Sequence, residues 1–284
     1  MESADGTRIR AWCNDADGRP VLLSNGLGTP PAAWPSFADV DCGFRVVTWY
    51  HRGLGGSDKP SDVERRRVED HTQDALAVMD AFEMPSALVV GWSLGVNVTF
   101  ELVREHPERI QGVLAVAGVP GGSFESMFAP LGVPRRFRAA TARAGAGLLK
   151  VYGPLLPFLT ATLPRGRSLP FGLIGPAREA THGHALLDVL HEFSRHDWSW
   201  FHDLAVAMAE HAPLDVSSAT MPVTVVAGLH DALVDVVDMR AMAASLGDAR
   251  YRELAGTHYI PLQYPEVMLD ELRQLAVRVD SRRS

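Results

Sequence analysis

The sequence predicts an α/β fold: a mostly parallel sheet with helices on both faces and an inserted helical segment. Short apolar, β-branched runs alternate with helical stretches over residues 7–118. Between residues 119 and 213 no strand-like run occurs, and proline and glycine separate apolar helical pieces. The alternation then resumes. We therefore expect an α/β core from residues 1–118 and 214–284, interrupted by a helical lid over 119–213, which is too long for an ordinary loop.

The first half of the chain predicts the following elements in order. Residues 7–14 alternate between apolar and polar side chains, which is typical of a half-exposed strand near a sheet edge. Residues 34–40 are compatible with a short helix. A second helix is expected over 69–84, because its apolar residues recur at helical spacing and Pro85 ends it. Largely apolar runs predict buried strands at 21–24, 44–49, 87–90 and 110–117.

The second half predicts helical pieces and then two more strands. Apolar helical pieces cover 146–152 and 186–193. A buried strand is expected at 223–227 and a further strand at 250–254, with a helix near 238–245 between them and a closing amphipathic helix over 265–279.

The composition excludes several classes of protein. Of 284 residues, 46% are hydrophobic and 21% are charged, as in ordinary globular proteins, and the net charge of -7 gives no reason to expect nucleic acid or an anionic membrane as partner. Two cysteines are too few for a disulfide framework, and neither Cys-x-x-Cys nor zinc-ligand spacing occurs. No apolar run reaches the length of a membrane span. The first residues lack the pattern of a signal peptide, which favours the cytoplasm. No signal for an oligomeric state is present.

The motif Gly-Trp-Ser-Leu-Gly at 91–95 organises the candidate site. A buried strand precedes it and a helical stretch over 96–105 follows, which is the context in which Gly-x-Ser-x-Gly forms a nucleophile elbow. The sharp turn lifts the hydroxyl of Ser93 above the sheet edge. Side chains at Gly91 and Gly95 would collide where strand and helix cross. The competing interpretation is an ordinary βα turn rich in glycine and serine, which the flanking strand and helix disfavour.

A serine hydroxyl needs a base to take its proton and a carboxylate to orient that base. With the chain order serine, acid, histidine, both partners should follow later strands of the sheet. Asp231 follows the strand at 223–227, and His258 follows the strand at 250–254. Nearby rivals for the acid are Asp235 and Asp238, which lie where a helix is expected to begin. The rival base, His230, precedes the acid.

Acyl transfer also needs two backbone N–H groups aimed at the developing oxyanion. One is expected from Leu94, directly after the nucleophile. The other is expected from Leu27, in the glycine-rich loop over 25–31. A plain glycine-rich connection is the alternative for that loop.

These motifs, together with Gly-Leu-His-Asp at 228–231 and Gly-Thr-His at 256–258, resemble those of the α/β-hydrolase family, in particular its lidded, esterase- and enol-lactonase-like members. The segment 51–57 is similar to the family's Asp-x-Arg-Gly-x-Gly-x-Ser loop. Two departures stand out. Asn25-Gly26 replaces the usual His-Gly, as in some enol-lactonase-like members, and Tyr50 replaces the aspartate of the loop.

The resemblance and the triad imply a serine hydrolase that cleaves a carboxylic ester or related acyl bond without a metal or organic cofactor. An apolar tunnel over Ser93 would suit a largely apolar small-molecule substrate, although packing of the lid onto the core is the alternative explanation for apolar residues in the insertion. Those residues are Phe124, Met127, Phe128, Phe137, Leu148, Leu149, Tyr152, Leu155, Leu156, Phe158 and Leu159. The candidate substrate contacts are Gly26, Trp92, Met127, Phe128 and Tyr259.

Other functions remain open on the same triad: a lactonase, a C–C bond hydrolase, a cofactor-free perhydrolase or haloperoxidase-like enzyme, and a ligand sensor without turnover. Serine at position 93 disfavours epoxide hydrolase and haloalkane dehalogenase chemistry, which in this family uses a carboxylate nucleophile. No metal site is expected, because the histidines around the insertion lack ligand spacing and are interpreted as lying on solvated helix faces. They are His182, His184, His191, His196, His202 and His211.

Overall fold

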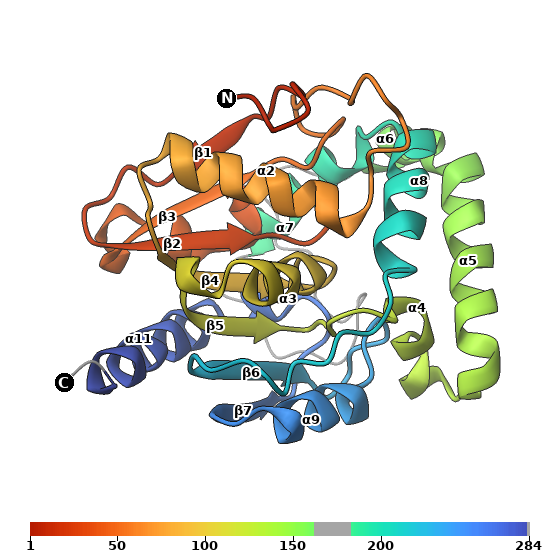
Figure 1. Ribbon diagram of the computed structural model, residues 1–284. Helices are drawn as coiled ribbons and strands as arrows, with labels where there is room; N and C mark the ends of the chain where they lie inside the picture. The colour runs from red at the N-terminus through yellow and green to blue at the C-terminus, as the bar shows by residue number, and fades with distance from the viewer. Residues whose placement is uncertain (162–182, 283–284) are drawn as a thin grey trace.

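The computed structural model describes residues 1–161 and 183–282, and its centre is a seven-stranded sheet (Figure 1). The strands lie in the order β1-β3-β2-β4-β5-β6-β7; β1 is antiparallel to β3, and every other pair is parallel. Their bounds are β1 (Ala11–Cys13), β2 (Arg19–Ser24), β3 (Phe44–Trp49), β4 (Ala87–Trp92), β5 (Ile110–Val116), β6 (Val223–Gly228) and β7 (Ala249–Leu254). The predicted fold class is confirmed.

Helices cover both faces of this sheet. Along β4, Val89 packs into the core on one face, and Leu88 and Val90 pack into the core on the other, which is the period-2 alternation of a strand buried on both sides. The first face is covered by α2 (Val68–Ala81), α3 (Gly95–Glu105) and α9 (Val236–Ser245). The second face is covered by α1 (Pro35–Ala38), α10 (Ile260–Gln263) and α11 (Pro265–Ser281).

A helical insertion separates β5 from β6, and its helices α4, α5 and α8 lie beyond the ends of the parallel strands (Figure 1). Within 119–161 and 183–213 it contains no strand, as predicted. The part of the predicted lid over 162–182 lies outside the described residues. The bounds are α4 (Ser123–Ser126), α5 (Arg135–Tyr152), α6 (Leu156–Ala161), α7 (Gly183–Ser194) and α8 (Trp198–Ala209).

Both ends of the insertion are tied to α3 by one buried side chain. The Nδ2 group of Asn97 donates to the carbonyl of Met208 (3.0 Å) near the end of α8. Its Oδ1 accepts from the N–H of Gly121 (2.6 Å), where the chain leaves β5. Gly122 also donates to the carbonyl of His211 (2.8 Å), so the outgoing and returning segments bond to each other. Asn97 lies one helical turn beyond Ser93, and this linkage therefore fixes the base of the insertion beside the nucleophile.

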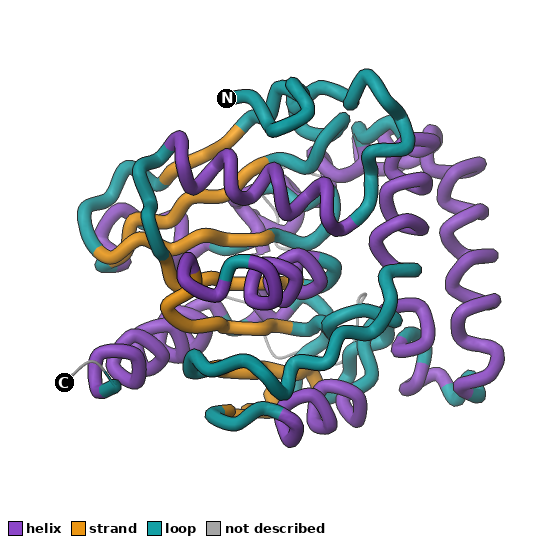
Figure 2. The backbone as a smooth tube through the Cα atoms, in the orientation of Figure 1, coloured by secondary structure: helices purple, strands orange, loops and turns teal. Residues whose placement is uncertain are grey.

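Some element bounds differ from the predicted ones. The strand predicted over 7–14 shrinks to β1, because Arg8 pairs instead with Glu2 in an isolated bridge. Helix α5 begins at Arg135, well before the predicted position 146, and only Ala142 of its residues is buried. Its first turns carry mainly arginine, alanine and glycine in place of large apolar residues, so the apolar periodicity there is weak. Loops join the strands to the helices at the edge facing the insertion (Figure 2), and that edge carries the candidate site.

None of the helices within 1–161 and 183–282 combines the length and the apolar character that crossing a lipid bilayer requires.

Candidate active site

Ser93 stands in a strained turn between β4 and α3. Its φ angle is +57°, in the left-handed region that side chains other than glycine rarely adopt. The flanking glycines allow this turn. A Cβ at Gly95 would lie 2.0 Å from the carbonyl oxygen of Ser24, and one at Gly91 would lie 2.5 Å from the hydroxyl of Thr99. The backbone thus has the geometry expected of a nucleophile elbow.

His258 and Asp231 meet Ser93 in one hydrogen-bonded chain. The Nε2 atom of His258 lies 2.8 Å from Ser93 Oγ, and its Nδ1 atom lies 2.9 Å from Asp231 Oδ2. The other oxygen of Asp231 accepts from the N–H groups of Leu233 (2.7 Å) and Val234 (3.0 Å). Asp231 is 1% exposed and His258 8% exposed, so water competes little for these bonds. The three side chains come from the ends of β4, β6 and β7, as the sequence predicted.

The rival residues have other roles. Asp235 caps α9 by accepting from the N–H of Val237 and pairs with Arg138. Asp238 pairs with Arg135, and His230 is exposed. None of the three rivals joins the hydrogen-bonded chain through Ser93.

Two backbone N–H groups near Ser93 are unpaired. In the described residues neither Leu27 N–H nor Leu94 N–H has a hydrogen-bond partner. Leu94 is the N-cap of α3, where N–H groups have no partner within the helix. Leu27 is 6% exposed, and a buried donor without a partner is costly. Both groups are therefore available to an anionic oxygen above Ser93.

An apolar cavity of about 440 Å³ opens over this constellation. All five candidate substrate contacts line it, together with Ser93, His258, Leu27 and Leu94. The insertion supplies one wall, formed by Phe124, Met127, Phe128, Ala142, Gly145, Ala146, Leu149, Phe193, Phe201, His202 and Ala205.

Not every apolar residue of the insertion reaches the cavity. Leu156 does not line it, and neither do several exposed residues of α5 and α6 and the turns beside them: Phe137, Leu148, Tyr152, Leu155, Phe158 and Leu159. Sequence reasoning missed the small side chains that α5 turns to the cavity, Ala142, Gly145 and Ala146. Their i, i+3, i+4 spacing is the signal that could have revealed this face.

The loop after β3 is held by a buried arginine. Arg52 is fully buried, and its guanidinium pairs with Asp74 (2.6 Å) and Asp5 (2.9 Å). Although burial opposes it, bonds from Thr7 and Arg52 lower the pKa of Asp5 to about 2. The indole N–H of Trp200 in α8 donates to the carbonyl of Arg52 (2.8 Å), so this loop also supports the insertion.

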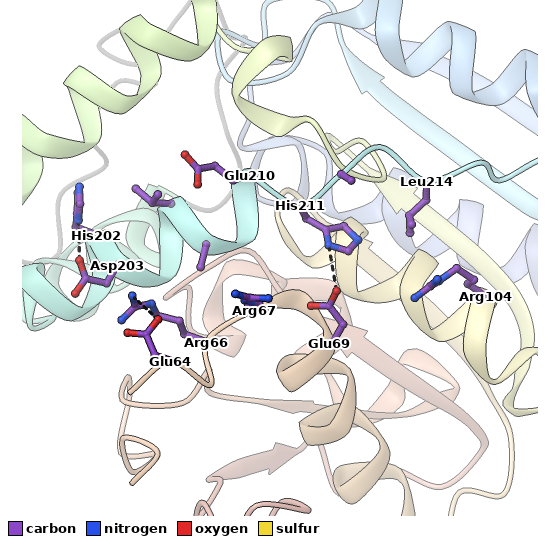
Figure 3. Close-up of a pocket in the computed structure, with 13 residues that line it drawn as sticks. Glu64, Arg66, Arg67, Glu69, Arg104, His202, Asp203, Glu210, His211 and Leu214 are labelled. Atoms are coloured by element: carbon purple, nitrogen blue, oxygen red, sulfur yellow. Dashed lines mark hydrogen bonds and ion pairs between the residues drawn. The ribbon is translucent and has the colours of Figure 1, made fainter. Parts of the chain in front are cut away.

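A larger hollow, of about 610 Å³, lies between α8 and the ends of α2 and α3 (Figure 3). It contains neither Ser93 nor His258, and charged side chains dominate its wall. His202 borders both hollows and bonds to Asp203 (2.9 Å), while His211 approaches Glu69 (3.8 Å). Because this hollow is lined by charged side chains and lacks both the nucleophile and the base, the apolar cavity over Ser93 is the better candidate site.

The histidines of the insertion only partly match the sequence interpretation. His182 lies outside the described residues, as does the side chain of His184. His196 and His211 do not lie on solvated faces: His196 Nε2 bonds to the carbonyl of Gly28 (2.7 Å), and the His211 side chain is 9% exposed. Among the residues described, no group of three or more metal-ligating side chains comes together.

A family model described as the alpha/beta hydrolase fold matches residues 19–265. The chain belongs to the α/β-hydrolase family. The predicted resemblance is thereby confirmed, and the sheet order, the elbow and the insertion described above are this family member's version of that fold.

Individual relatives differ in how much of this α/β hydrolase they match. A Caulobacter segnis protein provisionally named carbamate hydrolase RutD is 36% identical over 113 residues, which cover 37% of this chain and only 42% of that protein. A non-heme chloroperoxidase from Streptomyces lividans is 28% identical over 96% of this chain and 97% of its own. The enol-lactonase structure from Burkholderia xenovorans LB400 is similar in fold, with a TM-score of 0.70 and 22% identity over 96% of this chain and 97% of that one.

Proposed function

We propose that this α/β hydrolase is a serine hydrolase that cleaves a carboxylic ester or a related acyl bond of a largely apolar small molecule. The observation that carries the proposal is the unbroken chain from Ser93 Oγ through His258 to Asp231, at 2.8 and 2.9 Å, at the base of an apolar cavity. A nucleophile, a base and an orienting carboxylate in hydrogen-bond contact are the requirements of acyl transfer.

The mechanism follows from these contacts. Ser93 Oγ forms a bond to the substrate carbonyl carbon while its proton passes to Nε2 of His258, and the carbonyl π pair moves to oxygen. Asp231 accepts from Nδ1–H, which holds the reactive tautomer and stabilises the imidazolium. The N–H groups of Leu27 and Leu94 bind the oxyanion.

Breakdown of the tetrahedral intermediate then expels the alcohol, which takes the proton from His258. A water molecule attacks the acyl-enzyme, and His258 accepts its proton. The second intermediate collapses to the acid, and Ser93 recovers its proton from His258. Side chains and water account for every proton transfer in this cycle.

We propose further that residues 119–213 act as a lid and that their apolar wall selects the acyl chain. Support comes from the cavity lining, of which α5, α7 and α8 supply one side. The apolar character of the wall favours hydrocarbon over charged acyl groups, because a charged group would lose its hydration there.

The test compares the wild-type chain with Ser93→Ala on p-nitrophenyl esters of increasing acyl length, with lactones and aryl carbamates as further substrates. We expect ester turnover by the wild type, loss of about a thousandfold or more in Ser93→Ala, and labelling of Ser93 by a fluorophosphonate. Ester turnover that survives the alanine substitution would refute the serine mechanism. Labelling without turnover on any substrate would favour the ligand sensor.

A second candidate is perhydrolysis, which the full-length match to the Streptomyces lividans chloroperoxidase favours. In this reaction hydrogen peroxide replaces water as the nucleophile that attacks the acyl-enzyme, and a peracid is released. Adding hydrogen peroxide to an acetate ester assay distinguishes the two: formation of peracid that depends on Ser93 supports this candidate, and formation of acid alone opposes it.

A further inference from the structure

The loop that carries Leu27 is braced by a residue with no assigned role. The carbonyl oxygen of Gly26 accepts two hydrogen bonds from Thr29, one from its backbone N–H (3.0 Å) and one from its hydroxyl (2.5 Å). This carbonyl belongs to the same peptide unit as the N–H of Leu27. In a planar trans peptide the C=O and N–H bonds point in opposite directions. Fixing the Gly26 carbonyl therefore fixes the direction of the Leu27 N–H.

This peptide unit lies against the nucleophile. A Cβ at Gly26 would lie 3.5 Å from Ser93 Cβ, 3.3 Å from the Trp92 ring and 3.3 Å from the hydroxyl of Thr29. Thr29 itself lines the cavity over Ser93. The unpaired N–H of Leu27 is thus held close to where the oxyanion forms.

The fold of the loop does not depend on the Thr29 hydroxyl. The Asn25 side chain donates to the carbonyls of Thr29 (3.0 Å) and Pro30 (3.2 Å) and accepts from the indole N–H of Trp34 (3.1 Å). Asn25 is 2% exposed, so these bonds are shielded from water. Removing the hydroxyl would consequently leave the loop folded and withdraw one of the two bonds that orient the Gly26–Leu27 peptide.

The insertion braces the same loop from outside. Nε2 of His196, in the turn between α7 and α8, lies 2.7 Å from the Gly28 carbonyl, and its ring stacks on Phe201 with centroids 5.8 Å apart. A carbonyl can only accept, so His196 must carry its proton on Nε2. The position of the insertion is therefore transmitted to the loop that presents Leu27.

We propose that Thr29 is a positioning residue for the oxyanion: its N–H and hydroxyl orient the Gly26–Leu27 peptide so that the Leu27 N–H faces the oxygen that becomes negative, and His196 supports this loop from the insertion. The inference rests on the proposed serine hydrolase function. It goes beyond that function because it assigns the precision of the oxyanion site to two side chains that do not touch the substrate's reacting atoms.

The test uses a matched pair at position 29. Thr29→Val keeps the β-branched shape and removes the hydroxyl, whereas Thr29→Ser keeps the hydroxyl. With p-nitrophenyl butyrate we expect Thr29→Val to lower kcat by about 10- to 100-fold, the range for a misaligned catalytic group, with KM changed less than about twofold. Thr29→Ser should stay within about threefold of the wild type.

A second readout separates positioning from packing. Ser93 Oγ adds to the carbonyl carbon of a trifluoromethyl ketone, and the carbonyl oxygen becomes an oxyanion. The inhibition constant of this ketone should therefore rise in Thr29→Val by about the factor by which kcat/KM falls. Three results would overturn the inference: kcat unchanged in Thr29→Val, a loss in Thr29→Ser equal to that in Thr29→Val, or a rise in KM alone. If the wild type is labelled at Ser93 and turns over ester while Thr29→Val matches it, only this inference fails. If the wild type does neither, the proposed function fails as well.

His196 is tested in the same assay. His196→Gln retains an N–H donor at a similar reach, and His196→Leu does not. We expect the leucine variant to lose several-fold in kcat and the glutamine variant to recover most of it. Equal behaviour of the two variants would remove His196 from the proposal and leave Thr29 as the brace.

Discussion

The indole N–H of Trp92 donates to the backbone carbonyl of His258 at 3.0 Å, and the two rings lie with centroids 5.8 Å apart. Trp92 immediately precedes Ser93, so this bond joins the turn of the nucleophile to the loop of the base. Trp92 also lines the cavity. The same side chain therefore borders the cavity and ties the turn of Ser93 to the loop of His258.

Trp92→Phe should separate these two roles, because it keeps an aromatic ring and removes the donor. A buried carbonyl left without its partner costs about 1–3 kcal/mol of unfolding free energy. We expect a loss of that size in urea unfolding and a lower kcat, since the His258 loop is released. As a control, Trp198→Phe removes a similar bond, to the carbonyl of Ser194 (3.1 Å), without touching His258. An unchanged kcat in Trp92→Phe would show that other contacts hold the base.

The proposed selection of the acyl chain is testable on α5 with two glycines of the same helix. Gly145 lines the cavity and Gly147 does not, and a Cβ at either position would meet nothing within 4 Å. Gly145→Leu should fill part of the cavity and reduce kcat/KM for octanoate esters about tenfold or more relative to acetate esters. Gly147→Leu gains the same helix propensity, roughly 1 kcal/mol, but should leave this ratio unchanged. A ratio that moves equally in both variants would mean that α5 does not form the acyl site.

Apart from the short edge strand β1, sequence alone was sufficient to place the strands and to select Ser93, Asp231 and His258, which the structure brings into hydrogen-bond contact. Each of these depends on a local pattern, because the central strands are buried runs and each site residue lies within four positions of the end of a strand. The two side chains that brace the oxyanion loop, Thr29 and His196, cannot be predicted from a local pattern. His196 bonds to the Gly28 carbonyl across 168 positions of the chain, and no local pattern encodes such a contact. The glycine-rich loop by itself predicts Leu27 as a donor, but the role of Thr29 appears only once the direction of the Gly26 carbonyl is known.

For the apolar residues of the insertion, too, the sequence predicts only part of what the structure shows. Met127 and Phe128 were predicted from their apolar character and do line the cavity. Phe158 is equally apolar but is 74% exposed. Hydrophobicity identifies candidates for burial, whereas the direction in which a helix face points depends on its packing partners. That information is absent from composition and spacing.

The clamp formed by Asn97 should control the stability of the insertion. Asn97→Ala removes the bonds to Gly121 and Met208, and we expect a loss of about 1–3 kcal/mol together with faster proteolysis within the insertion. Asn14 provides the control. It is also buried and bonds to the carbonyls of Phe37 (3.2 Å) and Phe44 (3.0 Å). Asn14→Ala should destabilise the fold without exposing the insertion preferentially. Identical cleavage patterns for the two variants would contradict the clamp.

Two fully buried histidines beside β3 and α2 predict sensitivity to acid. His51 and His71 lie with ring centroids 5.2 Å apart, and neither ring nitrogen of His71 has a hydrogen-bond partner among the described residues. Burial lowers the pKa of each to about 3, assisted for His51 by His71 and for His71 by the charge of Arg52; Asp74 opposes the shift at His51. Both rings are therefore neutral in the folded protein well below the pKa of an unfolded histidine.

The sign of the pH dependence follows from proton binding. Between pH 6.5 and about 3 the unfolded chain binds protons at these two positions and the folded chain does not. The free energy of unfolding is therefore highest above about pH 6.5. Below that pH it falls, by up to about 1.4 kcal/mol per pH unit for each of the two histidines. His71→Leu removes one such group, so the loss between about pH 7.5 and about pH 5 should shrink by roughly 2 kcal/mol in urea unfolding. If His71→Leu loses as much stability on acidification as the wild type, His71 is protonated in the folded state and its burial does not cause the acid sensitivity.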